Sequence, residues 1–148
     1  MNDFTVIHLT EITTDIANEV TQLLRQHVPE TPPISIAHLE KITQSDTSYI
    51  FIAKHKSDKI IGMVTLLHTP KLDKLYKTEI EDLVVDESER GKGIGQALMR
   101  KAMEKAKELG ATTIYLTSKA SRVAANHLYK KLGFNQYATN NYKYRLIQ

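Results

Sequence analysis

Three glycines at alternate positions stand in the middle of this 148-residue chain, between an apolar run and an amphipathic one. The β-branched run before them predicts a strand, and the apolar spacing after them predicts a helix. A helix N-terminus carries unpaired N–H donors and a partial positive charge, so this junction is suited to bind a phosphate or pyrophosphate. The six candidate phosphate-binding residues are Arg90, Gly91, Lys92, Gly93, Ile94 and Gly95.

The spelling of this segment separates it from two common phosphate loops. A P-loop requires G-x-x-x-x-G-K-[ST], which the chain lacks, and the dinucleotide fingerprint G-x-G-x-x-G fails because Gln96 stands where its last glycine belongs. The segment fits R-x-x-G-x-G directly after a strand. It resembles the acetyl-CoA pyrophosphate loop of the GNAT superfamily of N-acetyltransferases. The alternative is a glycine-rich turn that binds no ligand.

A second segment strengthens this resemblance. Ala125, Tyr129, Gly133 and Phe134 spell A-x-x-x-Y-x-x-x-G-F, which is similar to the C-terminal part of the cofactor site in the same superfamily. Asn126 precedes Tyr129 by three residues, so the two share one face of a predicted helix. Gly133 is placed to end that helix in the left-handed conformation.

The resemblance implies acetyl-CoA as cosubstrate and assigns roles to individual residues. The phosphates would bind the loop from Arg90 to Gly95, and Asn126 would orient the cofactor or the tyrosine. The pantetheine arm would extend along the end of the preceding strand, at Leu83, Val84 and Val85, by main-chain hydrogen bonds. An N–H near Leu83 would face the acetyl oxygen.

Two residues are the catalytic candidates. Tyr129 would protonate the departing thiolate, since the family motif places a tyrosine there. Glu81 is the first candidate for the base that takes a proton from the amine, and Glu79 is the second. For Glu79 and Asp82 a role as solvated charges at the edge of a strand is favoured.

Composition excludes several other classes of protein. The net charge of +3 is too small to indicate nucleic-acid binding, and no apolar run is long enough for a membrane helix. Cysteine is absent, which removes disulfides, thiolate metal sites and a cysteine nucleophile. The six histidines lack metal-ligand spacing, so no metal is expected. Because the N-terminus lacks the layout of a signal peptide, we expect a cytoplasmic protein. We expect it to be either a monomer or a homodimer.

The order of predicted elements indicates one α/β (α+β) domain over residues 1–148. It resembles the GNAT fold: a mixed, mostly antiparallel central sheet of six to seven strands, flanked by about four helices. Strands are predicted at residues 4–9, 49–54, 60–67, 78–85, 112–117, 134–138 and 142–147. Helices are predicted at residues 13–27, 93–109 and 122–132, with a short helix that Ser35 caps and that contains Ile36, Leu39 and Ile42.

The expected function is an N-acetyltransferase that moves an acetyl group from acetyl-CoA to a primary amine by direct transfer in a ternary complex. The alternative is a non-catalytic regulatory module that binds CoA or acyl-CoA. The acceptor amine is not identified by any motif. Its pocket is expected at loops 28–33 and 68–75 and at the terminal hairpin, and Arg122 is either a carboxylate clamp or, as we favour, an exposed cation.

Overall fold

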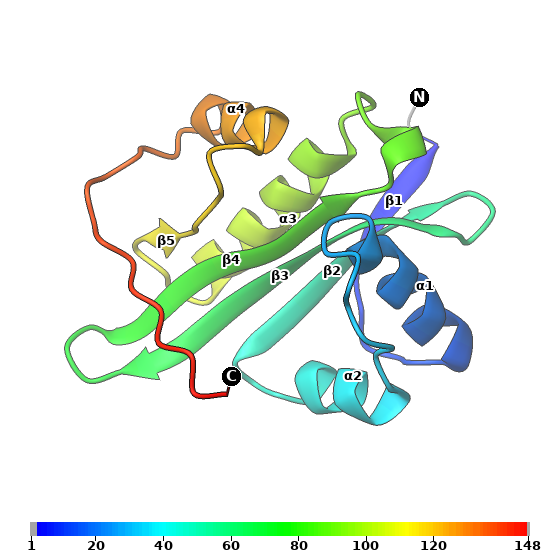
Figure 1. Cartoon of the computed structure of the whole chain (residues 1–148), viewed down its shortest axis with the longest axis horizontal. Helices are drawn as coiled ribbons and strands as arrows, with labels where there is room; N and C mark the ends of the chain where they lie inside the picture. Colours follow the sequence, from blue (N-terminus) through cyan, green and yellow to red (C-terminus); the bar gives the residue numbers. More distant parts are fainter. Residues whose placement is uncertain (1–2, 148) are drawn as a thin grey trace. The chain divides into compact units, whose positions relative to one another are not determined.

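The computed structural model describes residues 3–147 and divides into two compact units, Met1–Thr117 and Ser118–Gln148. The expectation of a single domain over residues 1–148 stays a prediction. In the first unit five strands form one sheet in the order β1-β2-β3-β4-β5 (Figure 1). The elements of this unit are β1 (Phe4–His8), α1 (Thr14–Arg25), α2 (Ile36–Thr43), β2 (Ser48–His55), β3 (Ile60–Lys71), β4 (Leu75–Val85), the 3-10 turn η1 (Glu87–Glu89), α3 (Ile94–Glu108) and β5 (Ile114–Tyr115).

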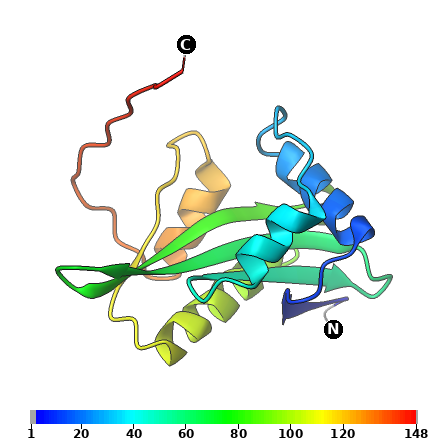
Figure 2. The ribbon, with the colours of Figure 1, turned by 90° about the horizontal axis from the view of Figure 1, so that it is seen from below.

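Helices cover both faces of this sheet. Figure 2 shows α1 and α2 on one face and α3 on the other. β1 to β4 pair antiparallel, whereas β5 returns parallel to β4 after the α3 crossover. The mixed, mostly antiparallel sheet expected from the sequence is therefore confirmed. The core under α1 contains Val20, Leu23, Ile50, Ile52 and Val84, all buried.

Gly62 sets how closely α3 approaches the sheet. A Cβ atom at this position would lie 2.9 Å from Leu98 Cδ1 and 3.0 Å from Ile94 Cγ2. Real Cβ atoms are essentially never that close to a neighbour, so the first turns of α3 pack on β3 because residue 62 has no side chain. This contact fixes the start of the helix that follows the glycine loop.

The hairpin between β3 and β4 is longer than expected. The loop predicted at residues 68–75 is mostly strand, because β3 continues to Lys71 and β4 begins at Leu75. His68 is 7% exposed, its Nδ1 lies 2.8 Å from Thr78 Oγ1, and its ring stacks on Tyr76 with the centroids 4.3 Å apart. Pairs between facing strands stabilise this segment, and such pairs are not visible in the local sequence pattern.

The second unit contains α4 (Val123–Lys131), and no strand lies within its described residues. The strands predicted at 134–138 and 142–147 are therefore wrong, and the sheet has five strands instead of six to seven. Tyr142, Tyr144 and Leu146 are 90%, 87% and 89% exposed. A strand requires a neighbouring strand to pair with, and the local sequence of this segment does not supply that partner.

The described residues contain neither a group of metal-ligating side chains nor a helix that could span a membrane. Among residues 3–147, no three His, Asp or Glu side chains are grouped so that they could hold a metal ion. None of the helices in that range is long and apolar enough to cross a membrane.

Candidate cofactor and catalytic site

Two glycines shape the loop between η1 and α3. Gly91 has φ 79° and Gly93 has φ 81°, which is the left-handed region where side chains cause strain. A Cβ atom at either position would meet nothing within 4 Å. Glycine is therefore required here by the backbone conformation, and the space beside the loop is open.

The start of α3 differs from the starts of α1 and α2. Thr13 Oγ1 accepts the N–H of Ile16, and Ser35 Oγ accepts the N–H of His38, so both of those helices have side-chain caps. α3 begins at Ile94, and the capping position before it is Gly93, which has no side chain and forms no side-chain cap. Its first N–H groups therefore lack the cap that the other two helices have, and they are suited to an anion.

The charges of the loop are partly used within it. Lys92 Nζ lies 2.7 Å from Glu89 Oε2, whose side chain is 22% exposed. Lys92 therefore offers less net positive charge to a phosphate than the sequence suggested. Arg90 is exposed and has extended backbone at the end of η1.

Several predicted cofactor residues have buried side chains. Ile94 is 2% exposed, Leu83 is 6% exposed and Val84 is 4% exposed, while Val85 is half-buried. Only the main chain of the buried three is suited to contact a ligand. Their side chains instead anchor β4 and α3 in the core.

β4 contains a bulge at Asp82 and Leu83, directly before Val84 and Val85. Met63 of β3 faces Val84, but Thr65 faces Glu81, so β4 has one more residue than β3 between these two pairs. Asp82, within the bulge, has φ 55°. Bulges bend a strand and redirect side chains, and they are common beside active sites.

The pairing of β4 with β5 ends before this bulge. Thr78 faces Ile114 and Glu79 faces Tyr115, and these two pairs make up the β4–β5 ladder. Between Ile80 and Val85, β3 is thus the only strand of the described chain that pairs with β4. The edge that was expected to accept the pantetheine arm is an edge without a neighbouring strand.

Glu81 and Glu79 differ in their surroundings. Glu81 is an exposed residue, but partial desolvation of its carboxyl raises the pKa above its ordinary value, and the nearby charges of Asp82 and Glu79 raise it further. Glu79 Oε1 forms an ion pair with Lys77 Nζ at 3.0 Å. Of the two, Glu81 has the properties of a proton acceptor, since its pKa is moved towards neutrality.

In the second unit, the predicted helix end is confirmed in detail. Gly133 has φ 97°, its N–H donates to the carbonyl oxygen of Lys130, and the N–H of Phe134 donates to that of Tyr129. This is a Schellman cap, in which the apolar residue after the glycine contacts the last turn of the helix. Here the contact is between the rings of Phe134 and Tyr129, with centroids 6.1 Å apart. The G-F pair of the motif thus has a structural role at the tyrosine.

Tyr129 is 6% exposed. Burial raises the pKa of its phenol, and the charge and hydrogen bond of Arg122 oppose this rise. Arg122 is half-buried. The expectation from the sequence that Arg122 is an exposed cation is therefore wrong. Asn126 Nδ2 donates to the carbonyl oxygen of Lys119 at 2.9 Å.

Two residues that the sequence did not single out lie at the entrance to the glycine loop. Asp86 follows β4, is buried, and its Oδ1 accepts hydrogen bonds from the N–H and the Oγ of Ser88. Gln26, at the end of α1, accepts the N–H of Glu87. The Asp-x-Ser spacing signals the first contact, but nothing local signals the second.

Comparison with known proteins agrees with these features. The model of the acetyltransferase (GNAT) family matches residues 14–134. The chain belongs to the GNAT acetyltransferase family. It is therefore an acyltransferase, and the family implies acetyl-CoA as its cosubstrate.

Individual GNAT proteins resemble this chain over most of its length. A glucosamine 6-phosphate N-acetyltransferase of Trypanosoma brucei brucei is 31% identical over 114 residues, which is 73% of this chain and 76% of the relative. The crystal structure of a Trypanosoma brucei acetyltransferase has a TM-score of 0.79 at 26% identity, covering 97% of this chain and 100% of the other. An aminoglycoside acetyltransferase from an uncultured soil metagenomic sample shares the fold, with a TM-score of 0.85 at 18% identity over 99% of this chain and 97% of that one.

Proposed function

We propose that this GNAT protein moves an acetyl group from acetyl-CoA to a primary amine by direct transfer in a ternary complex. The observation that carries the proposal is the start of α3, where Gly93 stands in place of a side-chain cap, shortly after the part of β4 that β5 does not border. A phosphate at this helix start would accept the N–H groups that no side chain caps. The backbone of Val84 and Val85 would then lie along the pantetheine arm.

In this mechanism Glu81 prepares the amine. A primary amine is mostly protonated near neutral pH, and it must lose a proton before its nitrogen attacks the acetyl carbon. The raised pKa of Glu81 makes its carboxylate a better acceptor for that proton, either directly or through a water molecule. Asp82 and Glu79 contribute by making the negative charge on Glu81 less favourable.

Tyr129 completes the reaction. Bound acetyl-CoA supplies the activated thioester, whose carbon–sulfur bond breaks as the carbon–nitrogen bond forms. The Tyr129 phenol gives its proton to the sulfur, and Arg122 stabilises the phenolate that remains. The phenolate then regains a proton from solvent. With no cysteine in the chain, an acetyl-cysteine intermediate is impossible, which supports direct transfer.

Amino sugars are the first acceptors to test. The name of the Trypanosoma relative specifies glucosamine 6-phosphate, and the name of the metagenomic neighbour specifies aminoglycosides. Both are amino sugars, although one is anionic and the other cationic. We propose that the acceptor of this protein is a small amine of this class, with peptide amines as the second candidate.

The decisive experiment measures release of the CoA thiol from acetyl-CoA with a panel of amines. The panel contains glucosamine 6-phosphate, glucosamine, an aminoglycoside and a lysine peptide. Thiol release that depends on one amine, with the acetylated amine detected by mass spectrometry, supports the proposal. Saturable CoA binding without turnover on any amine would instead favour the regulatory module, and no CoA binding would contradict both functions.

A further inference from the structure

The turn that leads from β4 into the glycine loop is held by contacts with β3, with the turn between β2 and β3, and with the end of α1. The N–H of Asp86 donates to the carbonyl oxygen of Ile61 at 2.9 Å, which extends the pairing with β3. Asp86 Oδ2 lies 3.6 Å from Lys59 Nζ, in the turn between β2 and β3. The side chain of Asp86 is only 12% exposed, so its position is defined by these partners.

Every N–H of η1 has an acceptor within the protein. The N–H of Glu87 donates to Gln26 Oε1 at 2.9 Å, and the N–H of Ser88 donates to Asp86 Oδ1 at 3.0 Å. The N–H of Glu89 donates to the carbonyl oxygen of Asp86 at 2.9 Å. The start of α3, a few residues later, has no such side-chain cap. The N–H groups of η1, before the glycine loop, are therefore occupied by acceptors in the protein. No side chain caps the first N–H groups of α3, after the loop, so they are suited to another acceptor.

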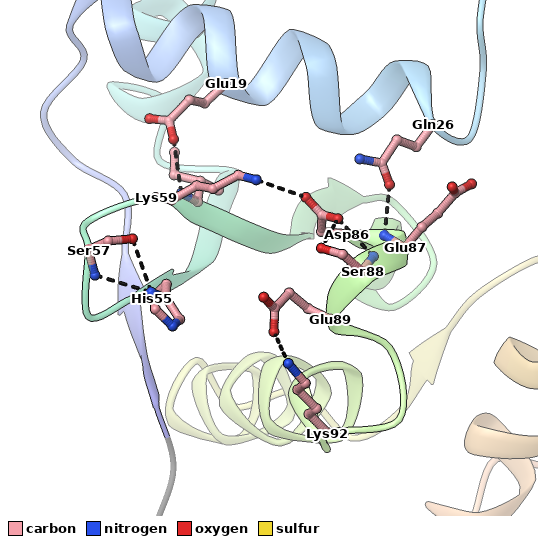
Figure 3. A network of polar contacts seen from close by, with 11 residues as sticks. Glu19, Gln26, His55, Ser57, Lys59, Asp86, Glu87, Ser88, Glu89 and Lys92 are labelled. Carbon is pink, nitrogen blue, oxygen red and sulfur yellow. Dashed lines mark hydrogen bonds and ion pairs between the residues drawn. The ribbon is translucent and has the colours of Figure 1, made fainter.

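Of the residues that hold this turn, Gln26 is the furthest from it in the sequence. It lies at the end of α1, and Glu19 of the same helix accepts the N–H of Ile60 at 3.1 Å (Figure 3). Residues seven apart lie on the same helix face, so both contacts come from one side of α1. Through this face α1 is joined to the first residue of β3 and to the turn after β4.

We propose that Gln26 is a positioning residue for the cofactor. Its side-chain oxygen fixes the path of the chain between β4 and the glycine loop, so that the start of α3 is already directed towards the pyrophosphate before CoA arrives. This inference rests on the proposed function. A ligand binds more tightly to groups that are already in place, because less ordering is required on binding. Loss of the contact therefore weakens CoA binding rather than the chemical step.

The test compares Gln26→Met with Gln22→Met. Methionine keeps the length of the side chain and has a helix propensity similar to that of glutamine, but it does not accept the Glu87 N–H as the amide oxygen does. Gln22 is an exposed residue of the same helix, so its replacement controls for the chemistry of the substitution. Calorimetric titration with CoA gives the dissociation constant of each protein, and thermal unfolding gives its melting temperature.

We expect Gln26→Met to weaken CoA binding about three- to tenfold, the usual range for one hydrogen bond, with Gln22→Met at the wild-type value. Unchanged CoA affinity in Gln26→Met overturns the inference, and so does a lower melting temperature with unchanged affinity, which would show a merely structural contact. Equal weakening in both variants also overturns it. Failure of the wild-type protein to bind CoA is a different result, because it contradicts the proposed function itself.

Discussion

Asn126 is joined to Lys119 across the segment that precedes α4, with Asn126 Nδ2 donating to the Lys119 carbonyl oxygen at 2.9 Å. The contact means that one side of this amide holds the chain before the helix. The side-chain oxygen is an acceptor, and it remains our candidate for orienting the cofactor or Tyr129. The two roles predict different effects of mutation.

We expect Asn126→Ala to weaken CoA binding or turnover with only a small decrease in melting temperature, since the hydrogen bond to Lys119 is exposed to solvent. His127→Ala is the matched control, because His127 is an exposed neighbour about a quarter-turn away on the same helix. CoA titration and thermal unfolding measure the two quantities. A large decrease in melting temperature with normal kinetics would assign Asn126 to holding the chain alone.

Gly93→Asp is expected to abolish or greatly weaken CoA binding. The substitution forces a side chain into φ 81° and places a negative charge at the proposed phosphate site. Gly110→Asp separates the two effects, because Gly110 has φ 83° and equally open space but lies at the other end of α3. Calorimetry with CoA should show weakening for Gly93→Asp alone, and equal affinity in a folded Gly93→Asp protein would exclude phosphate binding at this loop.

Tyr129→Phe tests the proposed general acid. The ring and its contact with Phe134 are kept, and the hydroxyl is lost together with its hydrogen bond to Arg122. We expect kcat to fall by at least about 10²-fold, the low end for a general acid, while CoA affinity stays similar. Tyr142→Phe, at a residue that is 90% exposed, is the control. Full kcat in Tyr129→Phe, with chemistry shown to limit the rate, would leave Tyr129 with a packing role only.

Glu81→Gln tests the proposed base, with Glu79→Gln as its control. We expect kcat/KM to fall about 10²- to 10⁴-fold in Glu81→Gln and little in Glu79→Gln, whose carboxylate is paired with Lys77. In the wild-type protein kcat/KM should rise with pH through the raised pKa of Glu81, because only the ionised carboxylate accepts a proton. If this rise of kcat/KM with pH is lost in Glu81→Gln but kept in Glu79→Gln, the titrating group is Glu81. If the rise persists in Glu81→Gln, Glu81 is not the base.

The Glu81 carboxyl also affects stability, which should decrease with rising pH whereas kcat/KM increases. Because the pKa of Glu81 is raised in the folded protein, the native state holds the proton more strongly than the unfolded chain does. The free energy of unfolding should therefore decrease as pH rises from the unfolded pKa to the folded pKa. Glu81→Gln removes this decrease, so its melting temperature at pH 7 should equal or exceed that of the wild-type protein. A clearly lower value would show that the carboxylate stabilises the fold.

Features determined by neighbouring residues were predictable from the sequence. The glycine loop, the start of α3 and the cap at Gly133 depend on backbone conformations that glycine alone adopts easily, and all three are where the pattern placed them. The Lys92–Glu89 ion pair was a less obvious consequence of close spacing. It changes the electrostatics of the loop without changing its shape.

Features determined by distant residues were not predictable. The extent of the β3–β4 hairpin, the bulge at Asp82 and the exposed C-terminal segment depend on which strands meet and in which register. The contact of Gln26 with Glu87 joins residues that are far apart in the chain, and an exposed glutamine at a helix end carries no local signal of it. Sequence spacing therefore located the candidate ligand groups, while the residues that hold them in place came from the fold.

The short parallel pairing of β4 with β5 has a consequence for folding. The hairpins β2–β3 and β3–β4 join adjacent segments, whereas Thr78 meets Ile114 only after the whole α3 crossover has been placed. Closing that longer loop costs more chain entropy, and only two residue pairs repay it. The amides of Ile114 and Tyr115 should consequently exchange with solvent deuterium well before those of β2 and β3. The short strand β5, which pairs with β4 just before the proposed cofactor edge, is thus expected to open before β2 and β3 do.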